Sequence, residues 1–515
     1  MPNPLPTAPA YKNLKVYYGD LHSHCAIGYG HGSMEDAFQN ARLQLDFAAV
    51  TVHSQWPDMP VGESRLDALV DYHQQGFQKT ADSWQQVKAL VEANNQPGQF
   101  VTFLGYEWHS NQYGDHNIYF KGSDGTPIPA PDLHNLRQAL RKLQEQGIDS
   151  LLIPHHIGYK QGYRGINWDV FDPEFSPVVE IMSMHGASES PEAPYPYLHT
   201  MGPRNWRSMY QFGLAQGHLA GAIGSTDHHS AHPGSYGHGR LAVWAKDLNR
   251  NTIWEAIKAR RTYALTGDRI AIKFSINGEP MGSIIPPASK RQITASVEGG
   301  GAIDYVELLF NNRVIHRAYP LEMIDFVKSD KFTGPLKIHF EVGWGPKGDD
   351  VDWQVALDVV GGRLLDVEPR FRGHDIVSPQ PGEHDSYSFS HWNRHNSDGV
   401  YFSTRTWGNT TTTTAGTQGI CLTVSGNDST LIRGQINGQA LEIKLVDLIE
   451  GPISGYLGGF MTPAYYFHKA VPRALVTCHI DFTHQTKSRT RDWYTMRVRQ
   501  INGQWAWSSP IWITP

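Results

Sequence analysis

The chain has 515 residues, of which 40% are hydrophobic and 18% are charged, and its formal net charge is −6. This composition is typical of a folded globular protein, so it excludes wholesale disorder, and the length favours two or more domains. The mild negative charge excludes a general electrostatic attraction to nucleic acid or to an anionic membrane.

The cysteines and the N-terminal segment bear on the cellular compartment of the protein. Cys25, Cys421 and Cys478 lie far apart, so they predict neither a disulfide framework nor a zinc ribbon. Residues 1–12 are rich in proline and lack the apolar segment of an ordinary signal peptide. No run approaches the ~18 apolar residues of a membrane span. We therefore expect a cytoplasmic protein with no membrane or nucleic-acid partner; its oligomeric state is left open.

Up to about residue 270, short apolar runs alternate with helical patterns. One helix should begin near Ser33, a second near Leu66, and a third after Asp132, which can cap it. The second should end before Pro97-Gly98 and the third at Gly147. Strands are predicted over residues 16–21, 47–52, 100–106, 151–153, 178–181 and 219–223. This alternation predicts an α/β fold with a parallel sheet covered by helices, either open or closed into a barrel.

After residue 270 the pattern changes to one typical of antiparallel β-structure. Asn277-Gly278, Asn437-Gly438 and Asn502-Gly503 each lie between apolar or alternating runs, which is a strong hairpin signal. Asn311-Asn312 is a candidate fourth turn, and residues 367–418 resemble a long irregular stretch. We therefore expect two domains: a metal-binding α/β domain over residues 1–275 and a β-rich, sandwich-like region over residues 276–515 with one or two subdomains.

Histidine is the unusual component of the composition, and it concentrates in the first half. Of the 26 histidines, seventeen precede residue 240. Several of them, with two acidic residues, directly follow the predicted strands: His22 and His24, His53, Glu107, His155 and His156, and the run Asp227-His228-His229. Because the carboxyl ends of parallel strands meet at one face, these side chains should come together there.

The chemistry of these side chains predicts a particular kind of metal site. Imidazole and carboxylate without thiolate suit zinc, manganese or iron. His22 and His24 alternate along an extended segment, so both can point toward one ion. Glu107 can bridge two ions, and ions ~3.5–4 Å apart can share an activated hydroxide. The residues alone leave open whether His155 or His156, and whether His228 or His229, is the ligand.

Taken together, these runs resemble the PHP (polymerase and histidinol phosphatase) family. The general resemblance is carried by Asp20-Leu21-His22-Ser23-His24, Thr51-Val52-His53, Glu107 and Asp227-His228-His229. Further stretches resemble one large branch of that family with a C-terminal β-rich region: residues 114–117, 154–156, 179–181, 224–234 and 261–269. The resemblance covers roughly residues 14–275.

The resemblance implies a distorted (βα)7 barrel that binds two or three divalent metal ions. On that basis His22 and His24 would bind a first metal with Glu107 and Asp227. Glu107 would bridge to a second metal, held by His116 and His155. A third would be held by His31, His53 and His229. Within this set Glu107 and Asp227, together with His185, are the candidate catalytic residues.

Four further residues are candidates for contacting a small-molecule substrate. Glu180 ends a predicted strand near the expected site. Lys160 and Arg164 follow the His155 strand in a glycine-rich loop and could hold an anionic group, as could Arg240.

The predicted function is hydrolysis by a metal-activated hydroxide. The resemblance to PHP enzymes favours a phosphoester as the substrate. An amide, lactone or carboxylic ester could be hydrolysed by the same parts, since a polarised carbonyl needs them too. A third hypothesis is a non-catalytic scaffold whose tryptophan-containing β half binds a glycan or a protein.

Overall fold

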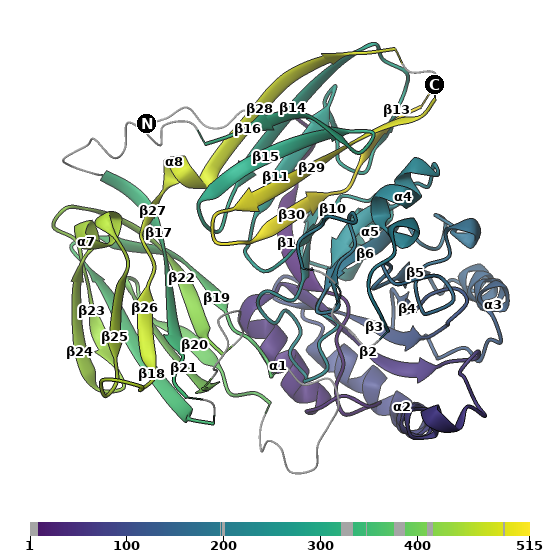
Figure 1. Cartoon of the computed structure of the whole chain (residues 1–515), viewed down its shortest axis with the longest axis horizontal. Coiled ribbons are helices and arrows are strands. Elements are labelled where there is room, and N and C mark those ends of the chain that lie inside the picture. Colours follow the sequence, from purple (N-terminus) through teal and green to yellow (C-terminus); the bar gives the residue numbers. More distant parts are fainter. Residues whose placement is uncertain are drawn as a thin grey trace.

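The computed structural model describes residues 9–195, 197, 201–320, 333–346, 348–374, 387–408, 416–487 and 490–514. The fold is mixed α/β with several β-sheets. Figure 1 shows an α/β part at the lower right, a group of β-strands above it and a second group of β-strands at the left. No helix among the described residues is long and apolar enough to cross a membrane.

The largest sheet has 13 strands and runs through both halves of the chain. Its strands in spatial order are β13 (Ile284–Ile285), β31 (Ile511–Ile513), β29 (Asp492–Gln500), β30 (Trp505–Ser508), β10 (Thr262–Leu265), β9 (Arg240–Ala245), β1 (Lys15–Asp20), β2 (Phe47–Gln55), β3 (Val101–Trp108), β4 (His116–Phe120) and β5 (Ser150–Pro154). Off this path, β15 (Ile303–Phe310) pairs with β29 and with β16 (Arg313–Ala318).

The expectation of a parallel sheet is met only in part. β1, β2 and β3 pair in parallel, whereas β4 is antiparallel to both β3 and β5, and β9 is antiparallel to β1. A separate three-stranded sheet has the order β7 (Gly186–Ala187), β6 (Val178–Ser183) and β8 (Gly221–Gly224). Within the described residues the two ladders stay open, so no closed hydrogen-bonded barrel is formed.

The helices of this part begin where the sequence predicts. α1 (Met34–Gln44) has a capping box, in which Ser33 accepts from the backbone of Asp36 and Asp36 accepts from that of Ser33. Asp132 caps α3 (Leu133–Glu145) by accepting from Asn135. The other helices of four or more residues in the described part of the chain are α2 (Asp67–Asn94), α4 (Tyr210–Ala215), α5 (Arg250–Lys258), α7 (Leu445–Glu450) and α8 (Arg473–Val476).

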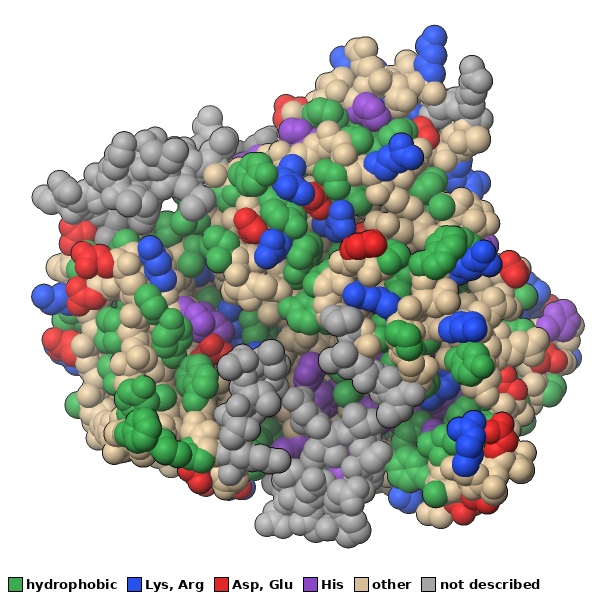
Figure 2. Space-filling view, in the orientation of Figure 1, with side chains coloured by type: hydrophobic (Ala, Val, Ile, Leu, Met, Phe, Trp, Pro, Cys, Tyr) green, Lys and Arg blue, Asp and Glu red, His purple; other side chains and the backbone are tan. Residues whose placement is uncertain are grey.

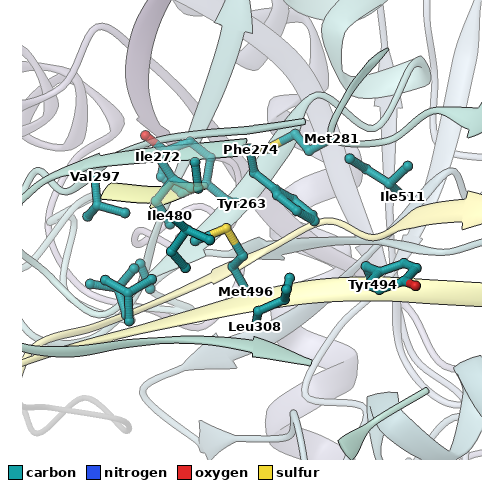
Figure 3. Close-up of a cluster of buried hydrophobic side chains, with 14 of the residues drawn as sticks. Tyr263, Ile272, Phe274, Met281, Val297, Leu308, Ile480, Tyr494, Met496 and Ile511 are labelled. Atoms are coloured by element: carbon teal, nitrogen blue, oxygen red, sulfur yellow. The ribbon is translucent and has the colours of Figure 1, made fainter. Parts of the chain in front are cut away.

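The second half is β-rich and contains two apolar cores. The first lies between the large sheet and a four-stranded sheet of β12 (Glu279–Pro280), β11 (Ala271–Ile276), β14 (Lys290–Glu298) and β28 (Thr477–Gln485). Figure 3 shows Phe274, Leu308, Ile480 and Met496 pointing toward one another in this core.

The second core lies between two sheets that stack as a sandwich. One sheet contains β19 (Arg363–Arg370), β22 (Gln418–Asn427), β17 (Thr333–Gly343), β26 (Ala464–Phe467), β25 (Ile453–Tyr456) and β27 (Val471–Pro472). The other contains β20 (His391–Asn396), β21 (Gly399–Trp407), β18 (Asp350–Val360), β23 (Leu431–Ile436) and β24 (Gln439–Lys444).

The predicted hairpins are confirmed. Asn277-Gly278, Asn311-Asn312 and Asn437-Gly438 turn between antiparallel partners, and the turn at Asn502-Gly503 joins β29 to β30. The irregular stretch predicted over residues 367–418 is wrong in part, because β20 and β21 pair there. Its polar composition hid an alternation in which Val400, Phe402 and Thr404 are buried. The threonine run at residues 410–414 lies outside the described residues.

The backbone ladder crosses the predicted boundary at residue 275. β10 of the first half pairs with β30 of the extreme C-terminus, at Tyr263 with Ser508 and at Leu265 with Ala506. Trp507 and Trp512 complete an apolar cluster that otherwise contains first-half residues such as Ile181. The last strands of the chain therefore pack as part of the α/β unit.

Candidate metal centre

The loops after β1 and β8 are tied together by one buried carboxylate. Asp20 accepts backbone hydrogen bonds from His22 at 3.0 Å, Thr226 at 3.1 Å and Gly234 at 2.7 Å. The backbone N–H of His24 donates to His228 O at 2.8 Å. These bonds satisfy the irregular backbone where the strands end, and they hold His22, His24 and Asp227 at one edge of the sheets.

A first group of four donor atoms lies close together where these strands end. His22 Nε2 lies 3.1 Å from His24 Nε2 and 3.2 Å from Asp227 Oδ1. His24 Nε2 lies 3.0 Å from Asp227 Oδ1 and 3.2 Å from Glu107 Oε2, which is 3.5 Å from His22 Nε2. All four side chains are nearly excluded from solvent. Two imidazoles and two carboxylates thus present one donor atom each to the same small space.

A second group adjoins it through the other oxygen of Glu107. Glu107 Oε1 lies 3.0 Å from His155 Nε2 and 3.1 Å from His109 Nδ1. His109 Nδ1 is 3.0 Å from Asp115 Oδ2, and His156 Nε2 is 3.2 Å from the same oxygen. The donor atoms of Glu107, Asp115, His155 and His156 lie within 4.8 Å of one another.

Histidine rings form a third group on the pocket side. The His24 ring stacks on that of His53 with centroids 3.7 Å apart and lies 4.4 Å from that of His229. His53 Nε2 is 3.5 Å from Glu107 Oε2. The ring of Tyr29 covers the other face of His53 at 3.5 Å.

The electrostatics of the centre follow from burial and from its mixed charges. Burial would raise the pKa of Glu107, but His109, His155 and His53 hold it well below its usual value. Burial lowers the pKa of His53 well below 6.5, and neighbouring His24 adds to this effect. Burial would also lower the pKa of His22, yet Asp227 and Glu180 hold it well above the usual value. Burial and the neighbouring charges therefore shift the pKa values of imidazoles in this centre in opposite directions.

Part of the donor set lies at the floor of a pocket of about 710 Å³. His53, Glu107, His156, Asp227 and His229 all line it. Histidine side chains are also visible near the centre of the face in Figure 2, between the α/β part and the sandwich. The pocket opens the donor groups to small molecules from solvent.

The match to a protein-family model lies almost entirely in the first half of the chain. Residues 38–192 and 235–279 match DUF3604, a protein family of unknown function. An uncharacterized protein of Chlamydia pneumoniae is 27% identical over 257 residues, which is 46% of this chain and 41% of that protein. An uncharacterized protein of Chlamydia trachomatis serovar D is 31% identical over 260 residues, 47% of this chain and 42% of that protein. The match thus spans about two fifths of the length of these relatives.

A solved structure is similar at a low level. It is a two-domain protein of Bacteroides vulgatus containing a predicted PHP-like metal-dependent phosphoesterase. Its sequence is 13% identical, the TM-score is 0.32, and the alignment covers 85% of this chain and 96% of that one.

Most of the sequence-predicted residues meet in the centre. The structure brings together His22, His24, His53, Glu107, His155, Asp227 and His229. His156 also faces the second group, whereas His228 turns away toward His238, with ring centroids 5.4 Å apart. His185 lies on the pocket wall, with Nε2 2.9 Å from Asp227 Oδ2 and Nδ1 3.0 Å from the Tyr159 hydroxyl.

His116 and His31 stand at the margin of this centre. Asn117 pairs with Glu107 and contacts His155 Nδ1 at 3.2 Å, so strand alternation places neighbouring His116 on the opposite face of β4. The His116 ring donates from Nδ1 to Gly114 O at 2.8 Å and packs near Trp108. His31 donates its backbone N–H to His229 O, but its ring contacts the Tyr387 hydroxyl at 2.7 Å.

Three of the four predicted substrate contacts do not line the pocket, and the fourth, Arg164, does. Arg240 is fully buried and bonds Gly234 O, Gly267 O and the Gln44 side chain, so it braces loops and does not face the pocket. Glu180 contacts His22 Nδ1 at 3.0 Å and orients that imidazole. Lys160 is exposed and does not line the pocket, with its ammonium over the Tyr163 ring. Arg164 lines the pocket but pairs with Asp115.

Three residues of the centre were missed by the sequence analysis: His109, Asp115 and Tyr29. His109 stands two positions after Glu107 at the end of β3, so the alternation that groups His22 with His24 could have identified it. Asp115 and Tyr29 reach the centre from loops, where spacing carries no such signal. Tyr29 is tied to the centre by its hydroxyl, which contacts His109 Nε2 at 3.1 Å.

Proposed function

We propose that this protein is a metal-dependent hydrolase of the PHP type, with its divalent metal ions held at the floor of the pocket. The observation that carries the proposal is the first donor group of His22, His24, Glu107 and Asp227. Ligands of a tetrahedral zinc ion at ~2.0–2.1 Å stand about 3.3 Å apart. Five of the six separations between these four donor atoms are 3.0–3.5 Å.

An unsatisfied buried atom also fits metal binding. Glu107 Oε2, which faces the first donor group, is buried and makes no hydrogen bond among the described residues. Burying a polar group without a partner costs stability, and such costs concentrate at functional sites. The second group, and the third group with His53 and His229, would hold one or two further ions. The total would then be two or three ions. Zinc, manganese and iron suit this donor set.

The order of strands supports the PHP-type barrel as the origin of this arrangement. β5 lies beside β6, and β8 lies beside β10, so the small sheet lies between the β5 end of the large sheet and its internal strand β10. On this proposal the barrel is distorted and open between those pairs. The same proposal divides the chain near residue 275 into a metal-binding domain and a β-rich region, with β30 and β31 at the C-terminus packed on the first.

Each residue of the centre has a distinct task in this proposal. Bound divalent ions would lower the pKa of a coordinated water and polarise the oxygen of the scissile group. Glu180 fixes the orientation of His22, and the two oxygens of Asp227 are divided between the first group and His185. On this proposal His185, which contacts Asp227 and the Tyr159 hydroxyl at the pocket wall, is the general acid for the leaving group.

We propose a phosphoester as the bond that is cleaved, on the resemblance of the strand-end motifs to PHP enzymes. A specific observation favours an amide, lactone or carboxylic ester as the second candidate. Arg164, whose guanidinium lines the pocket, is already paired with Asp115, which leaves a phosphate fewer charged partners.

Elemental analysis of the purified full chain tests the metal centre directly. We expect about two to three equivalents of a transition metal after reconstitution. The double variant His22→Ala/His24→Ala should lose at least one equivalent. The variant His134→Ala, which removes an exposed histidine of α3, should lose none. Metal-free protein after reconstitution with each candidate ion would overturn the proposal and favour a binding protein.

A further inference from the structure

The outer part of the pocket differs in chemistry from its floor. Leu69 and Tyr163 line it and are 40% and 60% exposed, whereas Glu107 on the floor is 2% exposed. Leu66, Tyr72 and Trp56 line the same space. The entrance is therefore formed by apolar and aromatic side chains from the β2–α2 connection, the start of α2 and the loop after β5.

Aromatic rings continue from this entrance to the donor atoms. The Tyr72 ring lies 4.9 Å from that of Tyr29, which stacks on His53 at 3.5 Å, and His53 stacks on His24 at 3.7 Å. Tyr72 also donates its hydroxyl to Tyr29 O at 2.6 Å, which fixes the two rings relative to each other. A flat group that enters the pocket thus meets ring faces and edges along one wall.

The charges near the entrance are compensated within the protein. Among the described residues that line the pocket, the arginines are Arg65 and Arg164. Arg65 pairs with Glu63 at 2.9 Å at the exposed rim. Arg164 stacks over Trp56 at 5.1 Å and pairs with Asp115. A second anionic group on a substrate would have to compete with these carboxylates, whereas an uncharged apolar group would not.

We propose that the substrate carries a flat, apolar and uncharged ring next to the hydrolysed bond, and that Leu69 and Tyr163 contact this ring. The inference rests on the proposed function only in taking the donor groups as the place where the bond is cleaved. Bulky aryl esters or amides are then the substrate class, and polyanionic substrates are excluded by the same pocket.

Equilibrium binding of small inhibitors separates ring recognition from catalysis. The full chain loaded with Mn²⁺ is titrated calorimetrically with phenylphosphonate and with methylphosphonate, which share one anionic head. A second pair, benzohydroxamate and acetohydroxamate, carries a carbonyl head. In at least one pair the aryl compound should bind about 30-fold more tightly than the methyl compound, because the ring is buried from water.

Two exposed positions test where the ring lies without endangering the fold. Leu69→Ala and Tyr163→Ala should each reduce the aryl-to-methyl ratio by about 3- to 10-fold. The control is Tyr456→Ala, since this tyrosine is also 60% exposed but lies in β25 of the sandwich. It should leave the ratio unchanged. Placing a carboxylate on the para position of the phenyl ring should abolish the gain.

The outcomes separate this inference from the proposed function. A ring preference in the hydroxamate pair alone would support the ring pocket and remove the phosphoester. Binding of the heads with an aryl-to-methyl ratio below about 3-fold, or a ratio that neither variant changes, would overturn the ring pocket and leave the metal centre standing. If none of the compounds binds protein that carries its metal ions, the ring pocket is overturned, and the metal content itself is unaffected.

Discussion

The α/β half and the β-rich half use strained backbone in different places. Non-glycine residues with left-handed φ in the first half include four beside the metal centre: His156 at 30°, Arg164 at 66°, Asp227 at 55° and Ala231 at 49°. In the second half they are mainly turn asparagines: Asn311 at 49°, Asn312 at 64° and Asn437 at 48°. Asparagine tolerates this region at little cost, and aspartate and histidine are also enriched there, so Arg164 and Ala231 carry the backbone strain of the first half.

Buried polar atoms without hydrogen bonds occur in both described halves, as at His53 Nδ1 and His339 Nε2, but their surroundings differ. Around the donor groups, imidazole nitrogens of His24, His53 and His156 are buried without hydrogen bonds among the described residues. The sandwich core is instead an apolar cluster that includes Trp353, Phe402 and Ile420. The first half therefore has strained backbone and unsatisfied imidazole nitrogens around its donor atoms, which cost stability. The core of the sandwich in the second half consists of packed apolar side chains.

Truncation after residue 275 is expected to have the largest effect. The fragment loses β30, which pairs with β10, and it loses Trp507 and Trp512 from the apolar cluster around Ile181. We expect it to aggregate or to lack a cooperative unfolding transition, measured by circular dichroism during thermal unfolding. A fragment that unfolds cooperatively and binds as much metal as the full chain would mean that the two halves are independent after all.

Replacing Trp353 by alanine should come next, because its side chain is fully buried in the sandwich. Removing such a side chain leaves a cavity and costs about 3–5 kcal/mol in the free energy of unfolding. The metal content of the folded protein should stay the same. Urea denaturation gives the first quantity and elemental analysis the second. Trp344→Ala serves as the control, since Trp344 is 38% exposed. Loss of metal from Trp353→Ala would contradict the view that the first half binds metal independently of packing in the sandwich.

At the contact between the first half and the sandwich, Glu368 should make the free energy of unfolding depend on pH. This buried carboxylate of β19 accepts from the backbone of Arg269 at 2.9 Å. Burial alone would raise its pKa, but Arg370, Lys337 and Arg269 bring the pKa of Glu368 down to about 2. Because the folded state lowers this pKa, the stabilisation is complete above the unfolded value near 4.5 and is lost as the pH falls toward 2.

The variant Glu368→Gln should therefore lower the free energy of unfolding by about 1–3 kcal/mol at neutral pH. The difference from the unmodified chain should shrink between pH 4.5 and pH 2, in urea titrations repeated at each pH. The surface variant Glu442→Gln, at a residue 55% exposed in its side chain, should show little difference at any pH. If Glu368→Gln lowers the free energy of unfolding by the same amount at every pH, then packing, and not charge, stabilises this contact.

The smallest expected effect concerns Arg164. Its guanidinium pairs with Asp115 and lies 3.9 Å from Glu107, so it competes with a metal ion for the same carboxylates. We expect Arg164→Met to bind the second metal about tenfold more tightly, since that competition is removed. Titration against a chromophoric chelator measures this. Lys160→Met, from the same loop, is the matched control. Weaker binding in Arg164→Met would instead make the arginine a support for the donor groups.

Much of the local structure could be predicted from the sequence because it depends on neighbours in the chain. The capping residues Ser33 and Asp132 mark where helices begin, and the Asn-Gly pairs mark hairpin turns. Apolar runs located the strands, and their ends located most of the donor residues. These features need only a few adjacent residues to be satisfied.

Partners far apart in the chain were decided by the tertiary structure alone. The face occupied by His116 depends on the register of β4 against β3, and the burial of Arg240 depends on carbonyls that loop folding brings to it. The pairing of β10 with β30 joins residues more than 230 positions apart, as the bond between Thr266 and Gln504 illustrates with a separation of 238. Sequence patterns identify which side chains can bind a metal; only the packing of distant segments decides which of them face it, because strand register and charge partners are set by contacts that no local pattern contains.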